Sequence, residues 1–163
     1  MFERFGDLPL HVLVIHAAVV VLPVAAATAI VFALMPRWRW ALRWPALGLA
    51  VIALGAAFVA KQSGEAFVAA VPQMAQLVQQ HQDHGSLLLW VTLVFTAVVV
   101  LAALRLSGPS ALASGRGAKP AGNRVVELAI SAAVVVMAVF VIYQTVRTGD
   151  SGAKAVWDGR LPS

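Results

Sequence analysis

The sequence predicts an all-α integral membrane protein, a bundle of four transmembrane helices connected in up-down order. Two observations carry this prediction. The chain of 163 residues is 61% hydrophobic and only 12% charged, whereas soluble domains average about half and about a quarter. The apolar residues also gather in four long runs, and each run is near the roughly 20 residues that cross about 30 Å of hydrocarbon as a helix.

These runs predict helices over about residues 8–35, 40–60, 72–104 and 125–146, within a single domain that spans 1–163. None of them alternates with the two-residue period of a barrel strand. Backbone inside a bilayer must satisfy its own hydrogen bonds, so helices are the remaining choice. The first run is too long for a cleaved signal peptide, and acids outnumber bases in the segment before it. We therefore expect it to be retained.

The third helix is expected to begin before its apolar core. From Pro72, a favourable first-turn residue, six positions keep one helical face and lead into the membrane run. They are Met74, Leu77, Val78, His81, Gly85 and Leu88. The segment 106–123 is rich in Gly, Ser, Ala and Pro, a composition typical of a flexible linker.

Basic residues are distributed unevenly between the two sides of the predicted bundle. Seven lie in the loops after the first and third helices, namely Arg37, Arg39, Arg43, Arg105, Arg116, Lys119 and Arg124. The other side has five, together with six of the seven acids. Because cytoplasmic loops carry the excess of Lys and Arg, we expect both termini outside the cytoplasmic membrane of a bacterium. The net charge of +5 is not a nucleic-acid signal, because these bases lie between apolar runs.

All four histidines fall at the predicted outer end of the bundle. His11 and His16 open the first helix, while His81 and His84 lie at the mouth of the third. The acids Glu65, Asp83 and Asp150 are expected at the same level. Ionisable groups at membrane depth are costly and favour a functional hypothesis. Cysteine is absent, so this chain provides neither thiolate metal ligands nor ligands of an iron–sulfur cluster.

The spacing of the histidines predicts which of them cooperate. His81 and His84 are three residues apart and share a helix face. His11 and His16 are five apart, about 140° around a helix, so a straight helix cannot aim both at one atom. His16 lies deeper than His11. We therefore predict that His16 and His81 approach within about 10 Å, the reach of one haem or one metal ion.

Three functional hypotheses follow. In the first, His16 and His81 ligate haem b axially inside the apolar bundle, with His11 beside them and Arg147 against a propionate. Such a haem would exchange electrons with a quinone or with another membrane or extracytoplasmic redox partner.

The second hypothesis is a site for zinc, copper or iron made by His11, His16, His81 and, as an additional ligand, His84. Glu65 or Asp83 would be a further ligand or would orient one. In the third hypothesis, the chain is an accessory or structural subunit without a cofactor, and the histidines only stabilise an interface. The sequence has no phosphate loop, no nucleophile elbow and no HExxH motif, so it indicates no enzymatic reaction.

Two further patterns predict structural roles. Small residues four apart, Ala46 with Ala50, let the second helix approach a neighbour closely. Trp38, Trp40 and Trp44 stand beside the inner arginines, the position of an interfacial aromatic belt.

Short motifs along the chain resemble a known family. The first helix opens with Leu-Pro-Leu-His-Val-Leu-Val-Ile-His over residues 8–16, close to a His-Pro-x-x-x-His run in which Val12 replaces the proline. His81 and Gly85 match a His-x-x-x-Gly start of the third helix, and residues 149–157 match a Gly-Asp-Ser-Gly-Ala-x-Ala-Val-Trp ending. The chain resembles the bacterial family of predicted four-helix membrane proteins called domain of unknown function twenty-two thirty-one.

This resemblance covers nearly the whole chain. It implies the four-helix membrane architecture, singles out His11, His16 and His81, and leaves His84 as an addition. Some relatives are joined to Rieske-type iron–sulfur domains, so the resemblance implies a role in electron transfer. The association of domains does not by itself indicate which reaction takes place.

Overall fold

The computed structural model describes residues 4–5, 8–106 and 123–157, and these residues form an all-α bundle. Four long helices run side by side along the molecule: α1 (Leu10–Leu34), α2 (Arg39–Ala70), α3 (Ala75–Arg105) and α4 (Arg124–Trp157). All four are long and apolar enough to cross a membrane. The predicted fold class is therefore confirmed.

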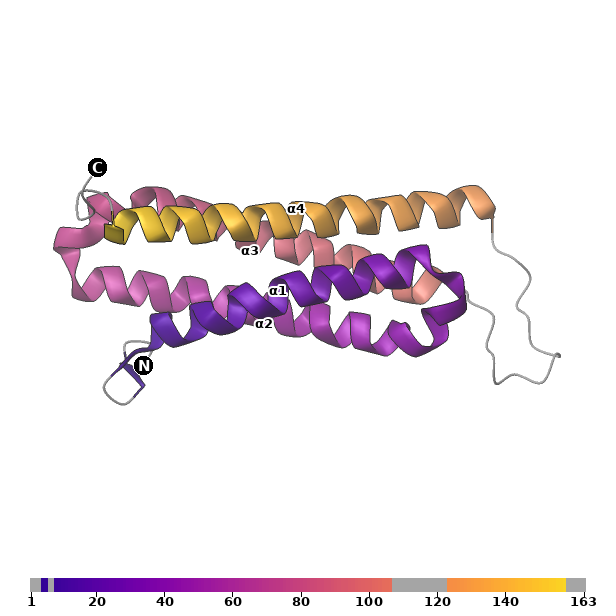
Figure 1. The fold of residues 1–163 in the computed structure, drawn as a ribbon, viewed down its shortest axis with the longest axis horizontal. Helices are drawn as coiled ribbons and strands as arrows, with labels where there is room; N and C mark the ends of the chain where they lie inside the picture. Colours follow the sequence, from indigo (N-terminus) through magenta and orange to yellow (C-terminus); the bar gives the residue numbers. More distant parts are fainter. Residues whose placement is uncertain (1–3, 6–7, 107–122, 158–163) are drawn as a thin grey trace.

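The connectivity is up-down, as expected. The start of α1, the end of α2, the start of α3 and the end of α4 lie together at one end of the bundle (Figure 1). We call it the histidine end. The opposite end, where α2 begins at Arg39 and α3 ends at Arg105, is called the arginine end.

Proline sets both of the turns that the structure describes between helices. The 3₁₀ turns η1 (Pro36–Trp38) and η2 (Pro72–Met74) each begin with a proline. The residues before these prolines, Met35 and Val71, have φ/ψ of −114°/84° and −131°/71°. Proline disfavours the helical region for the residue before it, so the chain leaves one helix there and starts the next.

Two helices extend beyond the predicted ranges. α2 was expected to end near residue 60 and continues to Ala70, and α4 was expected to end near 146 and continues to Trp157. In both extensions an i,i+4 ion pair, Lys61 with Glu65 and Asp150 with Lys154, supports the helix. Apolar length marks only the part of a helix that crosses the membrane, so it underestimates helices whose ends project into water.

Two further differences concern the edges of the predicted elements. Arg4–Phe5 (β1) pairs antiparallel with Leu8–Pro9 (β2) just before α1, and two-residue strands are too short to leave a periodic signal. The linker expected over 106–123 falls largely on residues 107–122, which lie outside the described residues.

The core of the bundle is built from small side chains, with a few large ones between them. Ala25, Ala26 and Ala29 of α1 face the bundle interior, as do Ala46 and Ala50 of α2, so the small pair predicted on the second helix is buried. Phe32 and Phe95 fill the space that the alanines leave. The three tryptophans near the start of α2 are exposed, and Arg43 lies 5.7 Å from the ring of Trp44.

Candidate functional site

The first histidine of the site is His11, in the opening turn of α1. Its ring is half-buried and reaches across to α2, where Nδ1 lies 3.1 Å from the carbonyl oxygen of Ala60 and 3.2 Å from the hydroxyl of Ser63. Ser63 is fully buried and donates its own hydrogen to the same carbonyl. A carbonyl oxygen only accepts, so Nδ1 of His11 carries the hydrogen and Nε2 keeps a lone pair.

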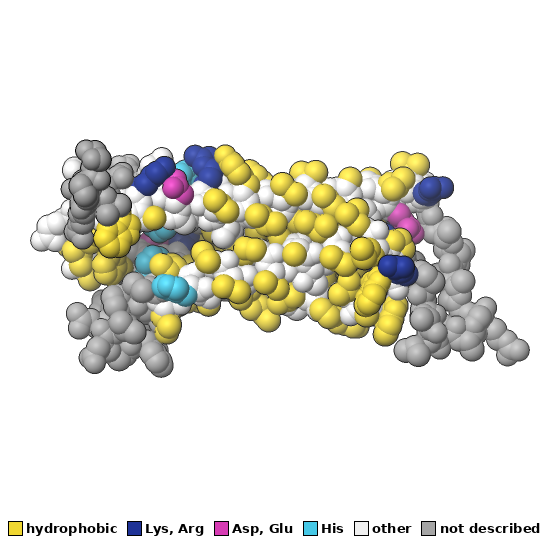
Figure 2. Space-filling view, viewed as in Figure 1, with side chains coloured by type: hydrophobic (Ala, Val, Ile, Leu, Met, Phe, Trp, Pro, Cys, Tyr) yellow, Lys and Arg dark blue, Asp and Glu magenta, His cyan; other side chains and the backbone are white. Residues whose placement is uncertain are grey.

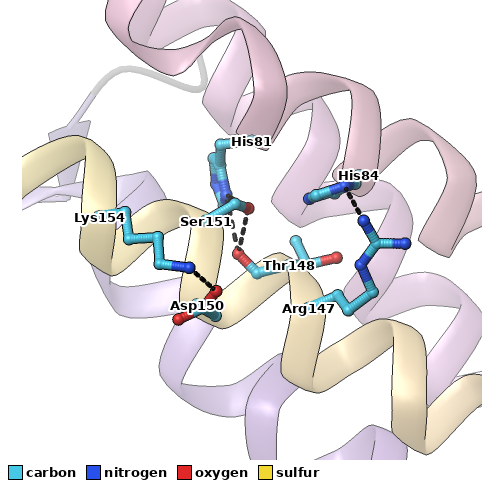
Figure 3. A network of polar contacts seen from close by, with 7 residues as sticks. All are labelled: His81, His84, Arg147, Thr148, Asp150, Ser151 and Lys154. Atoms are coloured by element: carbon cyan, nitrogen blue, oxygen red, sulfur yellow. Dashed lines mark hydrogen bonds and ion pairs between the residues drawn. The ribbon is translucent and has the colours of Figure 1, made fainter.

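His81 repeats this arrangement between α3 and α4. Its Nδ1 lies 3.0 Å from the carbonyl oxygen of Thr148 and 3.4 Å from the hydroxyl of Ser151. Ser151 is buried and donates to the carbonyl of Thr148. Figure 3 shows the ring of His81 directed from α3 at these two residues of α4. The same reasoning places a hydrogen on Nδ1 of His81.

A glycine makes room for each ring. A Cβ atom added to Gly64 would lie 3.1 Å from Cε1 of His11, and one added to Gly152 would lie 3.1 Å from Cε1 and Nδ1 of His81. Each helical hairpin therefore contains the same device, which we call a histidine clamp: a histidine on its first helix, and on its second a carbonyl followed three residues later by Ser-Gly. Sequence reasoning gave no role to Ser63 and Gly64, or to Ser151 and Gly152 of the terminal motif; the repeated Ser-Gly dipeptide was the available signal.

The two clamps bring their histidines together. The ring centroids of His11 and His81 are 6.1 Å apart, with an angle of 74° between the rings. Burial lowers the pKa of His11, and the charge of a protonated His81 lowers it further, while the hydrogen bond to Ala60 opposes the change. The balance favours neutral imidazole at His11, the form that ligates iron and other metals through Nε2. Among the described residues, neither Nε2 has a hydrogen-bond partner.

The histidine in contact with His81 is thus His11, whereas His16 is exposed on the surface of the bundle. We had expected the deeper His16 to pair with His81. Since five residues turn a helix by about 140°, only one of the two histidines of α1 faces the interior. The helix starts at Leu10, and α2 and α4 continue past the level of His11, so even the first turn of α1 is packed against neighbours.

His84 belongs to a second polar group one turn further inward, together with Gln144 and Arg147 of α4. A guanidinium nitrogen of Arg147 lies 3.2 Å from Nε2 of His84, and the side-chain amide of Gln144 donates to the backbone carbonyl of His84 at 3.3 Å. Figure 3 shows Arg147 reaching His84 from α4. Arg147 also lies 5.8 Å from the ring of Tyr143. Gln144 was not singled out from the sequence, since a lone glutamine in an apolar run has no distinctive spacing.

The acids expected near the site do not join the histidines. Glu65 pairs with Lys61, Asp150 lies 2.7 Å from Lys154, and Asp83 is exposed. Over the described ranges, no three His, Asp or Glu residues are grouped so that they could hold one metal ion. The metal site predicted from the sequence therefore stays a prediction, and the histidines that this part of the chain brings together are His11 and His81.

The histidine side chains visible in Figure 2 gather at one end of the face, and hydrophobic side chains cover its middle. α1 contributes a candidate membrane span of Leu13–Leu34, which begins two residues after His11. The pair of His11 and His81 thus lies at the boundary of the apolar band.

Comparison with protein families gives one match. The family described as predicted membrane protein (DUF2231) matches residues 7–162. No curated protein and no solved structure matches this chain.

Proposed function

Since this chain belongs to the DUF2231 family of predicted membrane proteins, we propose that it is a small membrane redox protein whose cofactor, haem b, is ligated by His11 and His81. The proposal places it in the cytoplasmic membrane of a bacterium, with the histidine end outside. The single observation that carries it is the contact between His11 and His81, two imidazoles whose Nδ1 atoms are each held by a backbone carbonyl, at the edge of an apolar bundle.

The distance between the two rings supports the proposal that both histidines ligate one iron ion. With bonds of about 2.0 Å between a metal and an imidazole nitrogen, two imidazoles on opposite sides of one ion have ring centroids about 6 Å apart. The centroids of His11 and His81 are 6.1 Å apart. Each Nδ1 is held by a backbone carbonyl, the outer contact that usually orients a ligating histidine and leaves Nε2 for the metal.

The size of the ligand set favours haem over a bare metal ion. Structural zinc sites use four protein ligands and catalytic zinc sites use three, whereas the described residues bring together only two. A porphyrin provides four nitrogens of its own and requires axial ligands alone. Arg147, whose exposed guanidinium lies at the same end of α4, is the proposed partner of a propionate.

The test is the haem content of the purified full-length protein, measured as absorbance in the Soret band relative to protein. We expect His11→Ala and His81→Ala to retain less than about a tenth of the haem, because each removes one axial ligand. His16→Ala is the matched control, a histidine of the same helix that is exposed, and should retain it. Elution from gel filtration in detergent would show whether each variant remains folded.

The competing function is an accessory subunit without a cofactor, and one observation favours it: both Nδ1 atoms already hold neighbouring helices together. In that case the wild-type protein has no Soret band when haem is supplied, and elemental analysis finds no metal. His11→Ala then lowers only stability. Zinc, copper or iron without a Soret band would instead support a bare metal site.

A further inference from the structure

A second polar site lies inward of the histidine pair, and its central residue is Gln144. This side chain is 1% exposed. Its amide nitrogen donates to the carbonyl of His84, so its oxygen Oε1 points elsewhere, and among the described residues Oε1 has no hydrogen-bond partner. A buried acceptor without a partner is costly, and such an atom in a folded protein calls for an explanation.

His84 provides a matching donor. Arg147 has no acceptor atom, so its contact with Nε2 of His84 requires a lone pair on that nitrogen. The hydrogen of the neutral ring is then on Nδ1. This atom is buried too, and no described residue accepts a hydrogen bond from it. An N–H donor and a C=O acceptor, both unpaired, are therefore contributed by residues that contact each other.

One kind of oxygen satisfies both atoms. A hydroxyl oxygen accepts a hydrogen bond from Nδ1–H of His84 and donates its own hydrogen to Oε1 of Gln144. A carbonyl oxygen could accept from His84 but would leave Gln144 unpaired. The site is therefore chemically selective for a hydroxyl, whether it belongs to water or to a larger ligand.

The surroundings favour a ligand from the membrane. Gln144 precedes Thr148 of the clamp by four residues, so it lies about 6 Å further along the axis toward the apolar band. On the same stretch of α4, the rings of Phe140 and Tyr143 are exposed and stacked, with centroids 6.4 Å apart and an angle of 13°. Tyr143 also lies 5.8 Å from Arg147, the partner of His84. Exposed aromatic rings near the polar pair suit a ligand that is itself an aromatic ring carrying a hydroxyl.

We propose that His84 and Gln144 bind a hydroxyl of a lipid-soluble hydroquinone, and bind it in preference to the corresponding quinone. Arg147 acts as a positioning residue, because its hydrogen bond holds the His84 ring in the tautomer that donates from Nδ1. The choice of a hydroquinone among ring hydroxyls rests on the redox role proposed above, since this molecule is the membrane-soluble electron donor that such a protein would meet.

The test is binding of a short-chain alkyl benzohydroquinone and its benzoquinone to the full-length protein under anaerobic conditions, by titration calorimetry. We expect the hydroquinone to bind about tenfold more tightly, since one additional buried hydrogen bond is worth roughly that factor. Gln144→Leu, which keeps volume and removes the acceptor, should abolish the preference by weakening only the hydroquinone. Gln79→Leu, an exposed glutamine at the same end, is the matched control and should change neither affinity.

A second measurement does not depend on a variant that folds. In the wild-type protein, hydroquinone should shift the ¹⁵N resonance of His84 Nδ1, while that of His11 changes little. Equal affinity for both forms, an unchanged preference in Gln144→Leu, or no binding would overturn the proposal and leave water as the partner of the two atoms. Haem content is measured separately in the Soret band, so loss of the haem proposal and loss of this one are distinguishable.

Discussion

At the histidine end, helices are joined by imidazoles whose Nδ1 donates to carbonyl and hydroxyl oxygens of the neighbouring helix. At the arginine end, α2 is joined to α1 and α4 by a charge. There Arg39 is 6% exposed, donates to the carbonyl of Ala33 at 3.0 Å and lies 3.4 Å from the carboxylate of Glu127. Both ends therefore use buried polar contacts between helices, with different chemistry.

The two ends differ in whether their buried polar groups are all used to hold helices together. The contacts of Arg39 link three helices through its charge, and adding a ligand there would mean breaking an ion pair. Each histidine of the clamps uses Nδ1 for the fold, and its Nε2 has no partner among the described residues. The histidine end can thus accept a ligand without losing its interhelical contacts, whereas the arginine end serves the fold.

The largest expected effect is at the arginine end. Arg39→Ala leaves Glu127, whose side chain is 27% exposed, without this partner. Losing one member of a fully buried pair costs about 3–5 kcal/mol; because Glu127 keeps some contact with water, we expect a loss of about 2 kcal/mol, measured by thermal unfolding in detergent. Arg43→Ala, at an exposed arginine of the same helix, should change stability by less than about 0.5 kcal/mol. Equal effects of the two would remove the distinction between the ends.

An intermediate effect is expected from the glycines of the clamps. Gly64→Ala and Gly152→Ala place a Cβ about 3.1 Å from a histidine ring, so the ring must shift, and we expect each to destabilise the protein by about 1 kcal/mol. At Gly48 and Gly55 of α2, an added Cβ meets nothing within 4 Å. Alanine there should stabilise by a few tenths of a kcal/mol through helix propensity. Unfolding midpoints measure both changes in stability. A decrease at Gly64 and Gly152 with an increase at Gly48 and Gly55 would show that only the first two glycines are needed to make room for a side chain.

The smallest effect is a dependence on pH that belongs to the histidine end alone. The pKa of His11 is lowered below its ordinary value of 6.5, first by burial and then by His81. Above 6.5 His11 is neutral in both the folded and the unfolded chain and adds no pH dependence. As the pH falls through 6.5, the unfolded chain binds the proton more readily, so the folded state loses stability.

Comparing unfolding midpoints above and below pH 6.5 for the wild type and for His11→Gln checks this direction. The glutamine variant does not titrate at this position and should lose less stability on acidification. A wild-type protein that becomes more stable below this pH would show that the pair prefers to be protonated.

Much of the architecture was predictable because it depends on short-range properties of the chain. The four apolar runs gave the four helices, and Pro72 marked the turn before α3. The lengths of α2 and α4 were underestimated, since Lys61 and Glu65 support one extension and Asp150 and Lys154 the other. Such pairs stabilise a helix outside the membrane, where hydropathy does not indicate where the helix ends.

The candidate site was only partly predictable. That the histidines share one end follows from the helix order and needs no packing detail. Their pairing does not, because it depends on which face each helix turns inward, and His11 and His16 lie on different faces of α1. The sequence also could not predict the polar contacts of Gln144. Its hydrogen bond to the carbonyl of His84 and the burial of its unpaired Oε1 arise only when α3 and α4 pack together.

The sequence by itself determined that this is a membrane protein, that it has four long helices, and that its histidines lie at one end of the bundle. These properties follow from the length of the apolar runs and from their order along the chain, and they do not depend on how the helices pack. Only the tertiary structure decided that His11 rather than His16 contacts His81, that Ser-Gly pairs hold both rings, and that Gln144 keeps a buried acceptor. The first of these depends on the rotation of α1, and the other two depend on contacts of 3.2 to 3.4 Å between residues at least 52 positions apart, to which hydropathy is blind.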